Sequence, residues 1–181
     1  MRGLEISKCP AKGTTMQFSS IYLLVVGLLF VSNPSLAATD VVACDLFDEP
    51  TVSSMIGARI KQHNPNRRKE INKGIPNSDC TFFYERHTVR VNLSEYASNA
   101  DAAKAYAEAA KTYATPNVTL TTESGLGEKA FWYRIATEQF GFTVLKGNRI
   151  VVLRINFKDA NTGAGLKERV RPKMQTAVSK L

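Results

Sequence analysis

The sequence predicts an α+β domain with a single antiparallel β-sheet and helices packed mainly on one face. Several segments alternate apolar and polar residues with a period of two and are joined by short polar turns, as in hairpins. Helical segments stand before, between and after these strands, without the β-α-β rhythm of a parallel sheet. The 181 residues are 44% hydrophobic and 22% charged, which excludes wholesale disorder and suits one domain with its own core.

The first segment is typical of a secretory signal peptide. Basic residues Arg2, Lys8 and Lys12 precede an apolar run over residues 21–31. This run is shorter than the roughly 20 residues that a membrane-spanning helix needs. Asn33-Pro34 and the small-residue site Ser35-Leu36-Ala37 follow it. We therefore expect a signal peptide over residues 1–37 and a single exported α+β domain over residues 38–181, with an uncleaved membrane anchor as the alternative.

The first half of the expected domain contains one short helix and one hairpin. Asp48 can cap a helix that tolerates Pro50 in its first turn and ends at Gly57. Residues 61–73 are polar and basic with no apolar period, so we expect a long exposed loop there. Alternation over residues 80–84 and 89–93 predicts two strands of an antiparallel hairpin.

The second half begins with the strongest helix signal. Ser98 and Asp101 resemble a capping box before an Ala-rich segment over residues 102–113. Strands are expected over residues 118–122, 129–135, 140–144 and 151–157, with a turn at residues 146–148 and a loop at residues 159–163. Apolar residues over 166–181 recur near a four-residue spacing, and Pro172 predicts a kink or a late start of this last helix.

Two cysteines remain in the expected mature chain. Cys9 leaves with the signal peptide, and Cys44 and Cys80 would enter an oxidising compartment, where a disulfide is favoured. Closing a loop of this length stabilises a fold by about 3–4 kcal/mol. The alternative is lipidation: Val41-Val42-Ala43-Cys44 loosely fits a lipobox, although residues 32–40 separate it from the apolar run. A lipidated Cys44 would tether the protein to a membrane and leave Cys80 without a partner.

No known catalytic or metal-binding motif occurs in the chain. The two histidines, His63 and His87, have no acid, Cys or second His at metal-ligand spacing, so we expect no catalytic residue, no metal and no cofactor. Gly125-Leu126-Gly127-Glu128 is expected to be a turn that uses positive φ angles. The alternative is an exported hydrolase with a site assembled from Glu128, Glu138 and His87.

Two features suggest a binding surface. The net charge is +8, and the basic run Arg67-Arg68-Lys69, with Lys167, Arg169, Arg171 and Lys173 of the last helix, could attract an anionic partner. Trp132 lies in the run Phe131-Trp132-Tyr133, which places rings on both faces of one strand; the outer ring either lines a binding surface or is buried under a helix. The expected partner is an anionic envelope component or another envelope protein, and not nucleic acid.

A series of short motifs resembles a family. The series comprises Cys44-Asp45-Leu46-Phe47, Ile56-Gly57, Cys80-Thr81-Phe82 and the segment Gly125 to Phe131. Over residues 44–157 the chain resembles secreted and lipid-anchored bacterial cell-envelope domains of unknown function, typified by actinobacterial lipoproteins, which are similar to the extracellular sensor domains of some receptor Ser/Thr kinases. The resemblance implies an antiparallel sheet with packed helices, a Cys44–Cys80 bridge and no known catalytic residues.

From these features we expect an exported binding or accessory protein of the cell envelope without catalysis, either periplasmic or secreted. A lipid-anchored, sensor-like domain is a further alternative. The chain differs from the lipoprotein members of the family in lacking a convincing lipobox.

Overall fold

The computed structural model describes residues 40–65, 70–72, 74–85, 87–136, 139–157 and 165–181. Within these ranges one eight-stranded sheet is accompanied by four helices, and every strand pair is antiparallel, which confirms the predicted α+β class. The predicted signal peptide, the basic run Arg67-Arg68-Lys69, Glu138 and the loop at residues 159–163 lie outside the described residues.

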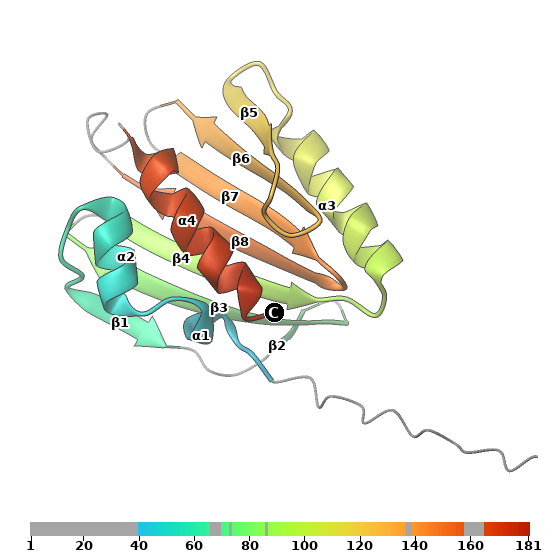
Figure 1. Cartoon of the computed structure of the whole chain (residues 1–181), viewed down its shortest axis with the longest axis horizontal. Coiled ribbons are helices and arrows are strands. Elements are labelled where there is room, and N and C mark those ends of the chain that lie inside the picture. The colour runs from blue at the N-terminus through green and yellow to red at the C-terminus, as the bar shows by residue number, and fades with distance from the viewer. Residues whose placement is uncertain (1–39, 66–69, 73, 86, 137–138, 158–164) are drawn as a thin grey trace, which may run out of the picture. The chain divides into compact units, whose positions relative to one another are not determined.

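The strand order places the last strand of the chain, β8, in the middle of the sheet between β4 and β7. The order is β1-β3-β4-β8-β7-β6-β5, with β2 paired to β3 beside β1 (Figure 1). The strands are β1 (Gln62–Pro65), β2 (Glu70–Asn72), β3 (Ile75–Tyr84), β4 (His87–Glu95), β5 (Val118–Glu123), β6 (Lys129–Ile135), β7 (Gln139–Lys146) and β8 (Arg149–Asn156). The predicted hairpins are confirmed as β3–β4, β6–β7 and β7–β8, and the central contact is β4 with β8.

The prediction of a loop over residues 61–73 is wrong, because this segment contributes β1 and β2. Both strands pair with the same edge of β3, β2 near its beginning and β1 near its end. An edge strand is held by backbone hydrogen bonds on one side and does not need apolar alternation, so the sequence pattern missed it. His63 of β1 lies opposite Phe82 of β3, and the two rings stack at 4.4 Å between centroids.

Three helices cover one face of the sheet (Figure 1). They are α1 (Ala43–Leu46), α2 (Glu49–Ile56) and α4 (Leu166–Ser179). The alternating apolar residues of β3, β4, β7 and β8 are buried beneath them and form the main core. Lys180, at the end of α4, donates hydrogen bonds to the carbonyl oxygens of Asp45 (2.8 Å) and Leu46 (3.0 Å). These contacts fix α1 against the sheet.

The predicted ends of α2 are confirmed, whereas the start of α4 differs from the prediction. Asp48 caps α2 by accepting a hydrogen bond from the Thr51 N–H at 2.9 Å, and Gly57 ends it with a φ of 70°. The late start predicted for the last helix is wrong, since α4 begins at Leu166 and continues through Pro172. Pro172 removes one helical hydrogen bond, but the burial of Val170 and Met174 on either side holds the helix together.

A single helix, α3 (Asn99–Tyr113), covers part of the other face. Ser98 caps it by accepting from the Asp101 N–H at 3.1 Å, as predicted. Its buried residues pack on Phe131, Tyr133 and residues of β7 and β8, so α3 lies over the β5–β8 half of the sheet. Three helices lie on one face of the sheet and one on the other, which agrees with the prediction of helices packed mainly on one face.

Candidate functional site

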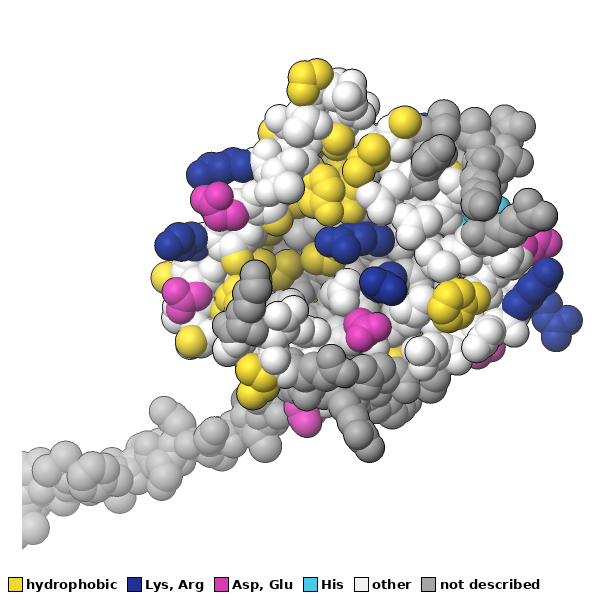
Figure 2. All heavy atoms as spheres, turned by 180° about the vertical axis from the view of Figure 1, so that it is seen from behind, with side chains coloured by type: hydrophobic (Ala, Val, Ile, Leu, Met, Phe, Trp, Pro, Cys, Tyr) yellow, Lys and Arg dark blue, Asp and Glu magenta, His cyan; other side chains and the backbone are white. Residues whose placement is uncertain are grey.

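The side of the sheet that carries α3 is only partly covered. Side chains of β3, β4 and the end of β8 on this side have no helix above them; we call them the open face. They are Phe83 of β3, Thr88, Arg90 and Asn92 of β4, and Arg154 of β8, whereas Thr81 on the same side is buried and Val152 packs against the cluster beneath α3. Figure 2 shows basic side chains near the middle of this side, with hydrophobic side chains on one side of them and an acidic side chain on the other. The fold therefore leaves part of a sheet surface accessible to a ligand.

Arg90 and Arg154 lie directly opposite each other across β4 and β8. Their side chains consequently project from the same face, and like charges in such a pair repel each other. Asp79 lies on this face one pair further along β3, yet in the described structure no ion pair joins it to either arginine. The Nε atom of Arg154 is buried, with no hydrogen-bond partner among the described residues. The open face thus presents two like charges that no ion pair joins to a carboxylate among the described residues, although Asp79 lies on the same face.

Tyr133 borders the arginine pair. Arg154 and Tyr133 are both register partners of Gly141, one on each side of β7. The absence of a side chain at Gly141 leaves the space that the Tyr133 ring occupies, and Tyr113 of α3 stacks on that ring at 3.8 Å. Burial raises the pKa of the Tyr133 hydroxyl, whereas the charge of Arg154 acts in the opposite direction. The buried hydroxyl lies near Tyr113 and Arg154, although neither makes a well-aligned hydrogen bond with it.

A groove opens further along the same face, between α3 and the beginning of β3. Its volume is about 370 Å³, and Ile75, Tyr96 and Ala105 are among its apolar lining residues. Asp101, Lys104 and Glu108 of α3 contribute two acidic groups and one basic group to the lining. Tyr96 follows β4 and is roughly 20 Å along the strand direction from Arg90, given about 3.3 Å per residue. A chain-like ligand could contact both the groove and the arginine pair.

The predicted basic residues of the last helix are engaged within the molecule. Lys167 and Arg171 form ion pairs with Glu123, and the Arg169 Nε–H donates to the Met55 carbonyl oxygen at 2.9 Å. These contacts hold α4 to β5 and α2. The basic patch expected on α4 is therefore largely a set of structural contacts.

Trp132 lies on the face that carries α4. Its ring stacks on Phe140 at 5.9 Å between centroids, and the Lys167 ammonium lies over it at 4.8 Å from the centroid. The ring is half-buried against the main core. Of the two alternatives drawn from the sequence, packing beneath a helix describes this environment, and the Nε1 atom of the ring is buried.

Of the three residues suggested for a hydrolase site, Glu138 lies outside the described residues, and Glu128 and His87 are not brought together. Glu128 accepts a hydrogen bond from the Gly147 N–H at 2.8 Å, at the end of the sheet where β4 finishes. His87 begins β4 and stacks on Tyr84 at 4.9 Å, at the opposite end. The length of β4 separates these two groups.

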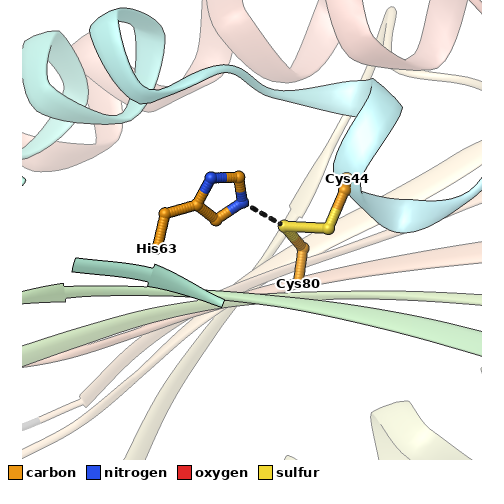
Figure 3. A group of neighbouring side chains, drawn as sticks. All are labelled: Cys44, His63 and Cys80. Carbon is orange, nitrogen blue, oxygen red and sulfur yellow. Dashed lines mark hydrogen bonds between the residues drawn. A yellow bond between two sulfur atoms is a disulfide. The ribbon is translucent and has the colours of Figure 1, made fainter. Parts of the chain in front are cut away.

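The predicted disulfide is present, and it has an unexpected neighbour. Cys44 of α1 is bonded to Cys80 of β3, with a Cα–Cα distance of 5.1 Å. His63 directs its Nε2 at Cys80 Sγ, 3.0 Å away (Figure 3). The Nδ1 atom of the same ring is 3.4 Å from a carboxylate oxygen of Glu49. The sequence analysis missed this cluster because it placed His63 in a loop without partners; only the β1–β3 pairing brings them together.

No protein-family model matches the chain, and no curated protein is significantly similar to it. Within the described ranges, no helix combines the length and the apolar character that crossing a bilayer requires.

Proposed function

We propose that this protein is an exported binding or accessory protein of the cell envelope, without catalysis, whose open face binds an anionic ligand. The ligand carries phosphate or carboxylate groups and belongs to the envelope. One observation carries the proposal: Arg90 and Arg154 are cross-strand neighbours on an uncovered sheet face and have no carboxylate partner in the described structure.

An anion on this face would remove an unfavourable interaction and add favourable ones. Directly opposed like charges destabilise a sheet by up to about 1 kcal/mol, and an anion between the guanidinium groups would offset this repulsion. Each guanidinium can also donate two parallel hydrogen bonds to a phosphate or carboxylate. The Nε–H of Arg154 is a donor without a partner among the described residues, and because it is buried, an anion reaches it only when the Arg154 side chain moves outward.

The groove beside α3 favours an extended ligand over a single small ion. It lies on the same face as the arginine pair and combines apolar walls with Lys104 and the carboxylates of Asp101 and Glu108, so the part of the ligand that enters it is uncharged. A polymer whose acidic groups reach the arginines and whose less polar portion enters the groove would fit this arrangement. Such chains are among the anionic components that a bacterial envelope provides.

Export is supported by two independent features. Residues 1–37 have the pattern of a signal peptide, and disulfides persist mainly in oxidising compartments. A Cys44 that is bonded to Cys80 has no sulfur valence for a thioether-linked lipid, so the bond favours the unlipidated form. The separation of Glu128 from His87 favours a role without catalysis over the hydrolase alternative.

Calorimetric titration with two probes tests the proposal: a linear polyphosphate and poly-glutamate. We expect one of them to bind, with an affinity that falls as salt is added, since the contacts are charge-assisted. Arg90→Gln and Arg154→Gln should each weaken binding by about 10- to 100-fold, as hydrogen bonds to charged groups are worth about 1.5–3 kcal/mol.

Arg134→Gln is the matched control. Arg134 lies opposite Phe140 and projects from the other face, so the change removes the same charge without touching the open face. Equal losses in all three variants would show that binding reflects net charge alone. If the wild-type protein binds neither probe at low salt, the open face is not an anion site.

A further inference from the structure

The Cys44–Cys80 bridge and His63 form a compact group of metal-ligating atoms. The two sulfur atoms and one nitrogen of the imidazole lie within 4.8 Å of one another. Cys80 is fully buried, Cys44 is 7% exposed, and the His63 side chain is 21% exposed. The three residues come from β3, α1 and β1, and all lie on the face that carries the main core (Figure 3). The group is thus preformed by tertiary structure and remains accessible from the His63 side.

The orientation of His63 is that of a metal ligand. Its Nε2 faces the sulfur of Cys80, and its Nδ1 faces the carboxylate of Glu49. In protein metal sites, the second ring nitrogen of a ligating histidine commonly donates its hydrogen to a carboxylate, which fixes the tautomer and makes the ligating nitrogen more basic. Glu49 is held in place as the first residue of α2, directly after the Asp48 cap. The stack on Phe82 further restricts the ring.

We propose that the reduced form of this protein binds one Zn²⁺ ion through Cys44 Sγ, Cys80 Sγ and His63 Nε2, with a water molecule in the fourth position and Glu49 orienting His63. The oxidised form does not bind the ion at this site, because each disulfide sulfur has formed a covalent bond in place of the thiolate that a metal requires.

Reduction of the disulfide and binding of zinc occur in two steps. A phosphine reductant breaks the S–S bond, becomes a phosphine oxide with the oxygen of one water molecule, and leaves two thiols. Zn²⁺ then displaces one proton from each thiol and takes the lone pair of neutral His63. Two thiolates and one imidazole suit zinc, which prefers sulfur and nitrogen ligands in tetrahedral geometry. Donor atoms in such a site are roughly 3.5–3.8 Å apart. Breaking the S–S bond lets the sulfur atoms separate, and His63 Nε2, 3.0 Å from Cys80 Sγ in the oxidised form, must also move slightly away from that sulfur.

Metal titration of the oxidised and reduced protein tests the proposal. The full chain carrying Cys9→Ser leaves Cys44 and Cys80 as the only cysteines. After anaerobic phosphine reduction, Zn²⁺ should bind at one ion per chain, and Co²⁺ should give the near-ultraviolet sulfur-to-metal absorption and the intense visible bands of a tetrahedral thiolate site. The oxidised protein should show neither.

Two variants separate this site from adventitious binding. Glu49→Gln should weaken zinc binding about 10- to 100-fold, the usual effect of losing a carboxylate that orients a histidine ligand. His63→Ala should weaken it at least as much and alter the Co²⁺ spectrum. His87→Ala is the matched control, since it removes the other histidine of the chain, and should change neither.

Three results would overturn the proposal. They are the absence of a one-to-one zinc complex in the reduced protein, an unchanged affinity in His63→Ala, or equal zinc binding by the oxidised protein. If reduction loosens the fold, the change is measured by near-ultraviolet circular dichroism of the reduced protein with and without zinc. The proposal then requires that one equivalent of Zn²⁺ restores the spectrum of the oxidised protein, and failure to restore it would also contradict the site.

Discussion

Removing the Cys44–Cys80 bond should lower the stability of the domain by about 4 kcal/mol. The two cysteines are 36 residues apart, and the chain-entropy relation for a loop of that size gives about 3.8 kcal/mol at 25 °C. The effect acts mainly on the unfolded chain, which gains conformational freedom when the bond is broken. In the folded state α1 keeps other attachments, including the hydrogen bond from the Ala43 N–H to Ser78 Oγ at 2.9 Å.

Urea unfolding with and without a phosphine reductant, in the presence of a chelator that removes zinc, measures this effect. With a urea m-value of about 2 kcal/mol/M, reduction should lower the midpoint by about 2 M. The double variant Cys44→Ala/Cys80→Ala should be destabilised to a similar extent and should not respond to the reductant. A wild-type midpoint that reduction leaves unchanged, or a double variant as stable as the oxidised protein, would refute the reasoning.

Substitutions at three further positions test the packing around Gly141, the helix cap at Asp48 and the effect of the ionisation of Asp48 and Tyr84 on stability. Gly141→Ala would place a Cβ atom within the Tyr133 ring, so urea unfolding should show a loss of about 1–3 kcal/mol that diminishes in a Tyr133→Leu background. Asp48→Ala should cost about 1 kcal/mol through the lost cap, and Asp48→Asn much less. Hydrogen bonds from Thr51 lower the pKa of Asp48, so its contribution is present above the ordinary carboxyl pKa and is lost as pH falls through the lowered value. The free energy of unfolding should consequently fall less steeply with decreasing pH in Asp48→Asn than in the wild type. An identical dependence on pH in both proteins would contradict this. Burial raises the pKa of Tyr84 to about 12, so stability should fall as pH rises from about 10 to 12, and Tyr84→Phe should reduce that fall.

The parts of the fold that could be predicted from sequence are those with a local cause. Alternation in β3, β4, β7 and β8 follows directly from burial of one face, as with Val89 and Val91 facing the core and Arg90 facing away. The caps at Asp48 and Ser98 depend on a side chain and a backbone N–H three residues away. Such features are encoded within a few residues, so a pattern can reveal them.

The parts that could not be predicted depend on contacts between distant segments. The edge strands β1 and β2 have no apolar period, and only the exposed edge of β3 determines their structure. Similarly, α4 continues through Pro172 because its apolar residues are buried against a core built by the rest of the chain. Local propensity was overruled by tertiary packing in both places.

The candidate site likewise combines features that have a local cause with features that depend on contacts between distant segments. The outward direction of Arg90 was evident from its strand, but its position opposite Arg154 requires β4 and β8 to be neighbours, which are separated in sequence by α3 and three strands. The bridge between Cys44 and Cys80 followed from the expected compartment and the cysteine count. His63 beside that bridge had no local signal at all.

Nuclear magnetic resonance of the arginine side chains tests the central claim most directly. The Nε–Hε signals of Arg90, Arg154 and Arg134 can be followed while the polyphosphate or poly-glutamate probe is added to the oxidised protein. The account predicts that the Arg90 and Arg154 signals shift together and saturate at one binding constant, while that of Arg134 stays in place. Saturable binding that leaves the Arg90 and Arg154 signals unmoved would contradict the assignment of the open face as the ligand site.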